Sequence, residues 1–188
     1  RRRPPTARAT EHARAISRYH ALEKQIARAS DSDKDALLAE QQALGGLEVY
    51  QNQSTTGGAV LRGGESSKWC AKILMELWPF SRRIHLLDVG AIAGTAYAKW
   101  KHRFDVTSID ILPRAPHVLP ADFFDFPMPA REEERFDVIG LSLVINFVGD
   151  LAKRGDMLLH AHRYLRRGGY VYVVLPLPLS LIHISEPT

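Results

Sequence analysis

Short apolar runs rich in β-branched residues recur through the second half of the chain, and helix-like or turn-like segments separate them. The runs cover residues 84–89, 104–109, 136–142 and 170–175. Runs of this length that do not alternate with polar residues are typical of strands buried on both faces of a parallel sheet. The segment from Leu151 to Arg166 has the composition of a connecting helix. The pattern therefore predicts an α/β fold with a doubly wound, mostly parallel sheet.

The composition of the 188-residue chain fits a folded domain, with 45% hydrophobic and 24% charged residues. This hydrophobic content is enough for a buried core, which excludes a chain that is disordered throughout. The single cysteine, Cys70, cannot form an internal disulfide or a cysteine-based zinc site. No apolar run reaches the ~18 residues that a membrane span needs. His160 and His162 lie two apart on a predicted helix and point in different directions, so we interpret them as surface or packing residues and not as metal ligands. We therefore expect no membrane span and no metal.

The amino end has a different pattern. Between residues 10 and 29, apolar side chains recur at spacings of three and four, at Ile16, Tyr19, Leu22 and Ile26. A second helix is predicted to begin near Ser32 and to stop at Gly45-Gly46. We therefore expect a helical hairpin over residues 10–44.

Positive charge is concentrated in the same part of the chain. Residues 1–30 hold eight basic and two acidic side chains, a local net charge of +6. Because the whole chain has a net charge of +4, the residues after 30 have a net charge of −2. A basic segment on a mildly acidic body is typical of contact with a polyanion such as RNA, or of a signal for entry into the nucleus. A solvated helix face with a frayed terminus explains the same charges equally well.

A glycine turn follows the first predicted strand, in the order Asp88-Val89-Gly90-Ala91-Ile92-Ala93-Gly94. Glycines at a turn between a strand and a helix let the backbone approach a ligand, and the helix would offer free N–H groups. The spacing lacks the order of glycines that marks a dinucleotide-binding fingerprint. It resembles instead the first motif of S-adenosylmethionine-dependent methyltransferases, with Ile92 where a middle glycine often stands.

Two further acids stand at successive strand ends. Asp110 closes the second strand 22 residues after Asp88, where a carboxylate can accept hydrogen bonds from both hydroxyls of a ribose. Asp122 follows a short apolar stretch and can accept a hydrogen bond from an adenine amino group, with Phe123 or Phe124 against the ring. One acid alone is better explained as a turn cap. Three acids at successive strand ends favour an adenosyl cofactor.

Several longer blocks narrow the resemblance. They are Tyr50-Gln51 with Ser54 and Gly57, Arg62-Gly63-Gly64-Glu65-Ser66-Ser67-Lys68-Trp69, Val89-Gly90-Ala91, Ser108-Ile109-Asp110, Asp122-Phe123, Pro127 with Pro129, 142–148, 154–158 and 174–178. They cover roughly residues 48–178 and resemble the fungal 25S rRNA adenine-N(1)-methyltransferase family, whose animal relatives act as S-adenosylmethionine sensors upstream of the TOR kinase complex. The resemblance implies a Rossmann-like class I methyltransferase fold, S-adenosyl-L-methionine as cofactor, large-subunit ribosomal RNA or a pre-ribosomal particle as partner, and a place in the nucleus and nucleolus.

The resemblance also implies which residues hold the cofactor. Gly90 and its turn would hold the methionine part, and Asp110 the ribose. Asp122 with Phe123 would flank the adenine. Arg62 would lie against the cofactor carboxylate, which a guanidinium can bind through two hydrogen bonds.

On the substrate side, the resemblance places Ser142 at the end of the fourth strand, where the methyl group faces the target. Asn146 and Phe147 would orient and stack on the base, although core packing explains Phe147 at least as well. Lys68 and Trp69 are divided in the same way between a substrate groove and helix packing. Adenine N1 already has a free lone pair, so positioning and charge complementarity should dominate over general-base chemistry.

Two classes of function stay open: an RNA-modifying enzyme, and a non-catalytic S-adenosylmethionine sensor that acts through protein partners not identifiable from the sequence. The basic amino end favours the enzyme, because a sensor has no need to attract phosphates. A small-molecule methyltransferase shares the strand-end acids but leaves the block at 62–69 unexplained.

The end of the chain departs from the family. After Pro178 two more strands would complete a seven-stranded sheet, whereas residues 179–188 read as an atypical, non-native tail. We therefore expect three parts: the basic arm and hairpin at 1–46, an incomplete methyltransferase core at 47–178, and this tail.

Overall fold

The structure, a computed structural model, describes residues 18–19, 21–45, 63–78 and 82–175. The described part contains one sheet of five parallel strands in the order β3-β2-β1-β4-β5. The strands are β1 (Ile84–Val89), β2 (Phe104–Asp110), β3 (Leu119–Pro120), β4 (Phe136–Ser142) and β5 (Leu165–Val174). The predicted doubly wound parallel sheet is therefore confirmed.

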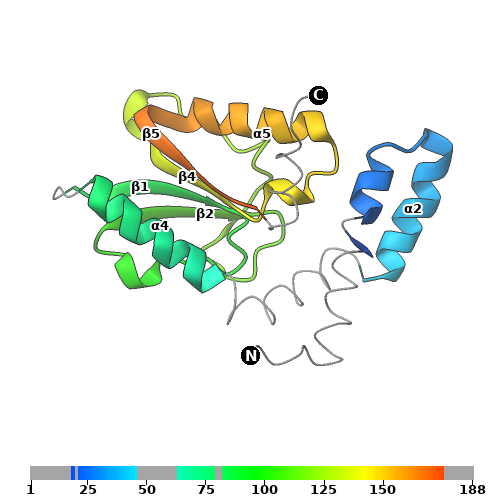
Figure 1. The fold of residues 1–188 in the computed structure, drawn as a ribbon, viewed down its shortest axis with the longest axis horizontal. Helices are drawn as coiled ribbons and strands as arrows, with labels where there is room; N and C mark the ends of the chain where they lie inside the picture. Colours follow the sequence, from blue (N-terminus) through cyan, green and yellow to red (C-terminus); the bar gives the residue numbers. More distant parts are fainter. Residues whose placement is uncertain (1–17, 20, 46–62, 79–81, 176–188) are drawn as a thin grey trace, which may run out of the picture.

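The helices lie on both faces of this sheet, α4 on one and α5 on the other (Figure 1). They are α2 (Asp31–Ala43), α4 (Gly63–Leu77) and α5 (Leu151–Tyr164), with short 3-10 turns η1 (Ala98–Trp100), η2 (Glu132–Glu134) and η3 (Ile145–Phe147). The sheet is thus the middle layer of three.

Each face of the sheet has its own hydrophobic core. Leu86 and Leu87 are both fully buried although they are adjacent in β1, because successive side chains of a strand point to opposite faces. Leu86 packs in the cluster that contains Cys70 and Leu74 of α4. Leu87 belongs to the cluster that contains Tyr164 of α5. This burial on both sides explains why β1 is almost continuously apolar.

The crossover from β1 to β2 differs from the prediction. The sequence led us to expect a helix directly after the glycine turn, but residues 91–103 form turns and the single 3-10 turn η1. Gly90, Ile92 and Gly94 all have positive φ, which a right-handed helix does not contain, so no helix begins at this turn. Tyr97, which is buried against Phe104, fills part of this side of the core.

The last strand begins earlier than expected. β5 runs from Leu165, and Gly168, with φ +78°, lies inside it. The register with β4 shifts between the pairs Phe136↔Leu165 and Val138↔Tyr170. The glycine pair therefore makes an irregularity in the strand instead of a turn that precedes it.

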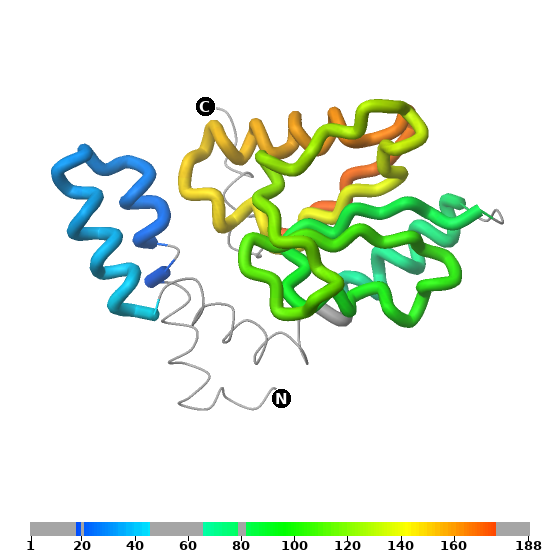
Figure 2. The backbone as a smooth tube through the Cα atoms, turned by 180° about the vertical axis from the view of Figure 1, so that it is seen from behind, coloured from blue at the N-terminus to red at the C-terminus, as the bar shows by residue number. Residues whose placement is uncertain are grey.

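The helical hairpin is confirmed for its described residues. Residues 18–19 and 21–26 are helical, and α2 begins at Asp31, slightly before the predicted start. Arg18 forms an ion pair with Glu40 across the hairpin. The hairpin lies beyond the carboxyl ends of the strands (Figures 1 and 2). A side chain at Gly149, in the loop before α5, would come within 2.5 Å of the Glu23 carbonyl oxygen, so hairpin and loop are in close contact.

No helix in the described ranges has both the length and the apolar character needed to cross a membrane.

Candidate cofactor site at the carboxyl edge of the sheet

The predicted strand-end residues gather at one edge of the sheet. Asp88, Asp110 and Ser142 stand at or next to the carboxyl ends of β1, β2 and β4, which are neighbours in the sheet. The chain leaves β1 for β2 on one side and returns to β4 on the other. Ligands of open α/β sheets bind outside the carboxyl ends of the strands at such a reversal of strand order. This edge is therefore the candidate functional site.

Gly90 lies in the turn that leaves β1, and its backbone conformation requires glycine. Its φ is +71°, in the left-handed region, and a Cβ there would come within 2.8 Å of a Val144 methyl carbon. The amides of Gly90 and Ala91 both donate to the Ile109 carbonyl oxygen, at 2.9 and 3.0 Å. These bonds hold the turn against β2. A narrow backbone cradle is the result; that it holds the methionine part of a cofactor stays a prediction.

Two other residues at this edge also have left-handed backbone. Ile92 has φ +49° and Leu143 has φ +59°, the positive values shown by non-glycine residues in the described ranges. This conformation is strained for any residue with a Cβ, and most for Ile92, which is branched at Cβ; such strain concentrates at functional sites. The sequence signal was present in Ile92, which stands where related motifs often have glycine, but its conformation was not predicted.

Asp110 is 4% exposed, and both of its carboxylate oxygens contact the surrounding loops. Oδ2 accepts a hydrogen bond from the Ile92 amide at 2.9 Å, and Oδ1 accepts one from the Leu112 amide at 2.8 Å. Asp110 thus supports the glycine turn, a role that the sequence did not reveal. Each carboxylate oxygen can accept a second hydrogen bond, so this role is compatible with the predicted bonds to ribose hydroxyls.

Asp88 is the most perturbed acid at this edge. Burial, and to a smaller extent the charge of Asp110, raises the pKa of Asp88 to about 7. Its Oδ1 would be at ordinary contact distance, 3.6 Å, from a Cβ placed on Gly140, so the carboxylate lies close against β4. Two buried carboxylates in electrostatic contact favour a ligand that brings positive charge. The sequence marks Asp88 as a strand-end acid at the start of the glycine motif, but not its raised pKa.

Asp122 and Phe123 have different surroundings. Asp122 is exposed, and its Oδ1 accepts a hydrogen bond from the Phe124 amide at 3.0 Å. Phe123 is 3% exposed, with its ring centroid 5.0 Å from that of His160 and 5.5 Å from that of Tyr164. The carboxylate of Asp122 is accessible to a ligand. The Phe123 ring packs in the core below it, and Phe124 is only partly buried against the same core.

Ser142 ends β4 beside the start of α4. Its Oγ lies 3.4 Å from Oγ of Ser66, and the Ser66 carbonyl oxygen accepts a hydrogen bond from the Tyr172 hydroxyl at 2.7 Å. The ring of Tyr172 stacks with that of Trp69 at 6.0 Å, and Trp69 is 59% exposed. The structure therefore joins part of the block at 62–69 to the end of β4. Arg62 itself lies outside the described residues.

Asn146 follows in η3 and is 7% exposed. Its Oδ1 is buried, and no hydrogen-bond partner is found for it within the described part of the chain. A buried acceptor without a partner costs about 1–3 kcal/mol, so such atoms often mark a place where a ligand binds. Phe147, also in η3, is partly buried.

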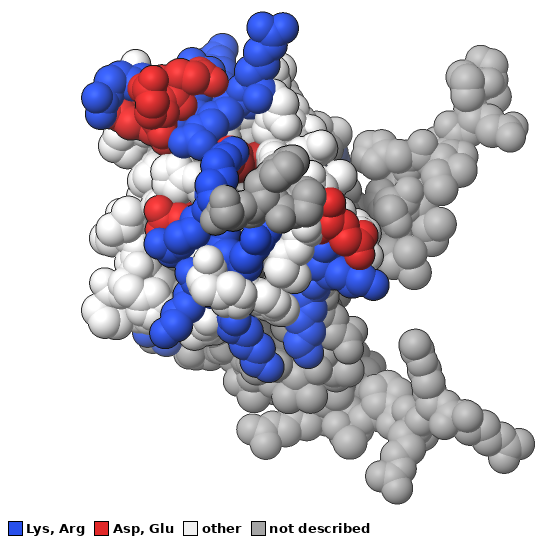
Figure 3. Space-filling model, turned by 90° about the vertical axis from the view of Figure 1, so that its left-hand side faces the viewer, with Lys and Arg blue, Asp and Glu red and all other residues white. Residues whose placement is uncertain are grey.

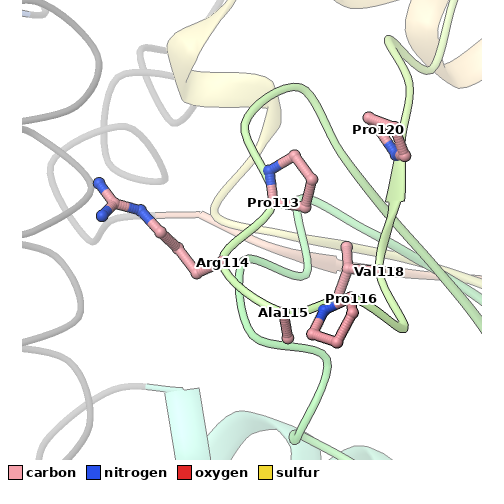
Figure 4. Close-up of a pocket in the computed structure, with 6 residues that line it drawn as sticks. All are labelled: Pro113, Arg114, Ala115, Pro116, Val118 and Pro120. Carbon is pink, nitrogen blue, oxygen red and sulfur yellow. The ribbon is translucent and has the colours of Figure 1, made fainter.

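A shallow hollow of about 540 Å³ adjoins this edge in the loop between β2 and β3 (Figure 4). Its lining is rich in proline: Pro113, Arg114, Ala115, Pro116, Val118 and Pro120. The Arg114 amide donates to the Ile92 carbonyl oxygen at 2.8 Å, which fastens the hollow to the glycine turn. The hollow thus shares its support with the candidate site.

Within the described residues, no group of three or more His, Cys, Asp and Glu side chains is arranged to hold a metal ion.

Comparison with known sequences places the chain in a family. Residues 35–185 match the family described as 25S rRNA (adenine(2142)-N(1))-methyltransferase, Bmt2. The 25S rRNA (adenine(2142)-N(1))-methyltransferase of Saccharomyces cerevisiae is 31% identical over 170 residues, which are 86% of this chain and 50% of that protein. The 25S rRNA adenine-N(1) methyltransferase of Schizosaccharomyces pombe is 30% identical over 144 residues, 71% of this chain and 52% of that protein. The chain spans about half the length of the curated relatives that it matches.

Solved structures support the fold. The sugar N-methyltransferase KedS8 from Streptoalloteichus is similar with a TM-score of 0.50 and 24% identity, over 63% of this chain and 50% of that one. The plantazolicin methyltransferase BpumL is similar with a TM-score of 0.51 and 14% identity, over 87% of this chain and 60% of that one. These likenesses show a Rossmann-like class I methyltransferase fold. Since the family match covers most of the sequence, the chain belongs to the Bmt2 family of 25S rRNA adenine-N(1)-methyltransferases.

Proposed function

We propose that the protein to which this chain belongs methylates N1 of an adenine in large-subunit (25S) ribosomal RNA, with S-adenosyl-L-methionine as methyl donor. The observation that carries the proposal is the Gly90 turn beside two buried carboxylates, Asp88 and Asp110, in a chain whose relatives bear this activity in their names. The proposal concerns the whole protein, because the chain spans half of those relatives.

The residues present suit this cofactor. At Gly90 a Cβ would meet a Val144 methyl carbon at 2.8 Å, so the cradle has no room for a side chain and offers bare backbone to a ligand. Asp88 and Asp110 supply negative charge for a cationic ligand, and Asp110 in addition would accept bonds from ribose hydroxyls. Asp122 would accept a bond from the adenine amino group. Arg62, which lies outside the described residues, would bind the carboxylate. When bound, the cofactor supplies an electrophilic methyl group on a sulfonium.

The chain's own task is then to position a base. N1 of neutral adenine carries a free lone pair, so no proton has to be removed before attack. Asn146 Oδ1 is a buried acceptor without a described partner, and the adenine amino group next to N1 is a donor that asparagine commonly binds. Ser142 borders the place where the two substrates meet, and Phe147 would stack on the base. A target inside a duplex has to be unstacked first.

Two further parts of the proposal rest on the sequence and the family. The segment 1–46 would serve as a basic arm and hairpin that contacts ribosomal RNA or a pre-ribosomal particle, and the protein would work in the nucleus and nucleolus. The basic residues 1–17 lie outside the described part of the chain. Neutralising the arm should flatten the salt dependence of RNA binding and leave cofactor affinity unchanged.

The direct test is mass analysis of large-subunit rRNA nucleosides from cells with and without the full-length gene. We expect one N1-methyladenosine to disappear when the gene is absent, and to return with wild-type protein but not with Asn146→Ala. Unchanged rRNA methylation, together with tight cofactor binding by the purified protein, would favour the non-catalytic sensor.

Asp110 provides a second test, specific to the ribose. Asp110→Ala should weaken cofactor binding by about 1.5–3 kcal/mol for each lost bond to the charged acceptor. The loss should be smaller for an analogue that lacks both ribose hydroxyls, measured by calorimetry. Equal losses for the two ligands would show that Asp110 acts only by holding the Ile92 and Leu112 amides.

A further inference from the structure

The opposite edge of the sheet, where the strands begin, carries a concentration of basic side chains. Arg82 and Arg83 precede β1, Lys101 and Arg103 precede β2, and Arg166 and Arg167 lie at the start of β5. Because the strands are parallel, their amino ends meet at one edge. We call these six residues the basic edge. It lies at the far end of the strands from Gly90 and Asp110.

The basic edge is accessible. The side chains of Arg82 and Arg83 are 54% and 53% exposed, and Lys101 and Arg167 are also exposed. Figure 3 looks onto this face and shows Lys and Arg side chains spread over much of it, with acidic side chains gathered mainly toward its margins. A ligand can therefore reach several of these cations at once.

A buried acid holds two of the arginines in place. Asp137, at the start of β4, has a side chain only 3% exposed. It accepts two hydrogen bonds from Arg82, at 2.7 and 2.8 Å, and one from Arg166, at 3.2 Å. Arg166 also donates to the Glu133 carbonyl oxygen at 2.6 Å. One carboxylate thus fixes two guanidinium groups and leaves one positive charge in excess.

The surplus of charge is local. The basic edge has six cations against the two carboxylates within it, Asp105 and Asp137. When the adjoining segment 131–135 is added, with its two arginines and three glutamates, the surplus falls from four to three. The chain after residue 30 has a net charge of −2, so the rest of this body is correspondingly acidic.

We propose that the basic edge binds phosphates of RNA, as a second contact surface separate from the candidate methyl-transfer site. This inference rests on the proposed function, because a ribosomal RNA is long enough to touch both edges. The guanidinium groups fixed by Asp137 lose little side-chain entropy when they bind, and arginine suits phosphate oxygens through paired N–H donors. Contacts to phosphates position an RNA without reading its sequence.

The separation of the two surfaces gives the proposal a specific consequence. A strand of six or seven residues is roughly 20 Å long, so a short oligonucleotide held at Asn146 cannot reach the basic edge. Substitutions there should therefore weaken binding of long RNA and leave cofactor binding unaffected.

The test uses the full-length protein and an in vitro transcript of 25S rRNA. The edge variant carries Arg83→Gln, Lys101→Gln and Arg167→Gln, and it keeps Arg82 and Arg166 on Asp137. The control carries Lys72→Gln and Lys153→Gln, which are exposed on α4 and α5, away from the strand starts and outside the segment 1–46 that is itself proposed to contact RNA. Affinity is measured at several salt concentrations, with calorimetric cofactor affinity as a check on folding.

We expect the edge variant to lower the slope of log K against log salt by about 2, since each lost phosphate contact removes roughly 0.7–0.9. The control should change the slope by less than half as much. If the triple variant does not fold, the single variant Lys101→Glu, which reverses one exposed charge, replaces it. This variant should lower the slope by about 1.

If the edge and control variants give equal slopes while the wild-type protein methylates the transcript, the basic edge does not bind RNA. The proposed function would then still stand. A wild-type protein that neither binds nor methylates the transcript would overturn both.

Discussion

Asp88 and Asp110 end neighbouring strands, yet their surroundings differ. Asp110 accepts hydrogen bonds from two backbone amides, whereas burial holds the pKa of Asp88 near 7. An acid whose pKa is higher in the folded than in the unfolded state keeps a proton that the unfolded chain releases above about pH 4. Stability should therefore fall as pH rises from about 4 to 7.

Asp88→Asn tests this pH dependence. The amide cannot ionise, so the variant should gain a few kcal/mol relative to wild type between about pH 4 and 7 and keep that gain above pH 7. Denaturant unfolding of both proteins across this range measures the difference. A difference that does not change with pH would show that Asp88 has an ordinary pKa in the folded protein.

Ile92 tests the strain in the glycine turn. A left-handed backbone costs about 1–2 kcal/mol for an L-residue with a Cβ, and glycine in its place costs about 0.5–1 kcal/mol in chain entropy. Ile92→Gly should leave the free energy of unfolding unchanged or raise it by about 1 kcal/mol. Ala91→Gly, one residue earlier and without positive φ, should lower it. Denaturant unfolding measures both variants. A larger loss in the free energy of unfolding for Ile92→Gly than for Ala91→Gly would contradict backbone strain at Ile92.

The residue scale is also where the sequence was least informative. Gly90 could be predicted, because a glycine after a strand-end acid is a local signal. The packing of Phe123 against His160 and Tyr164 could not, since it depends on where α5 lies. That Asn146 Oδ1 finds no partner among the described residues likewise depends on the fold as a whole.

At the scale of elements, the start of β4 depends on one buried acid. Burial opposes ionisation of Asp137, but hydrogen bonds from Arg82 and the His85 amide and the charges of Arg166 and Arg82 outweigh it, so its pKa lies below the ordinary value. Ionised Asp137 therefore contributes to the free energy of unfolding. This contribution is fully present above about pH 4, where the unfolded chain also ionises, and is lost as the pH falls through the lower pKa of the folded protein.

Asp137→Asn should therefore lower the free energy of unfolding at neutral pH by about 2 kcal/mol, because two arginines lose their shared partner. The loss should shrink below about pH 4. Asp105→Asn is the control, since the side chain of Asp105 is 62% exposed and 3.4 Å from Arg83, and exposed pairs contribute about 0–1 kcal/mol. Equal losses for the two variants, from denaturant unfolding, would contradict an anchoring role.

Elements were more predictable than residues. Strands β1, β2, β4 and β5 and helix α5 followed from apolar runs and their spacing, because burial on both faces leaves a pattern that does not depend on distant contacts; the short strand β3 was not predicted. The helix predicted directly after β1 was wrong: the turn motif suggested it, but the left-handed backbone at Gly90, Ile92 and Gly94 leaves only turns and η1 there.

At the scale of the whole molecule, the sheet separates two edges with different chemistry. The carboxyl edge gathers Asp88, Asp110 and Asn146 around the Gly90 turn, and the amino edge gathers arginines around Asp137. The sequence predicted the first edge through its motifs. It did not reveal the second, because the basic residues are spread over separate segments that only the parallel topology brings together.

Cofactor binding by a Gly90 variant is the most direct measurement. Gly90→Arg puts a side chain into the cradle, whereas Gly168→Arg puts one at a glycine of similar φ, +78°, with nothing within 4 Å. Both variants bear a comparable backbone cost, so Gly168→Arg is a matched control for strain. Circular dichroism establishes that each is folded.

Calorimetric titration with S-adenosylmethionine should show binding to the wild type and to Gly168→Arg, and none to Gly90→Arg. Unchanged affinity in a folded Gly90→Arg protein would contradict a cofactor site at the carboxyl edge of the sheet.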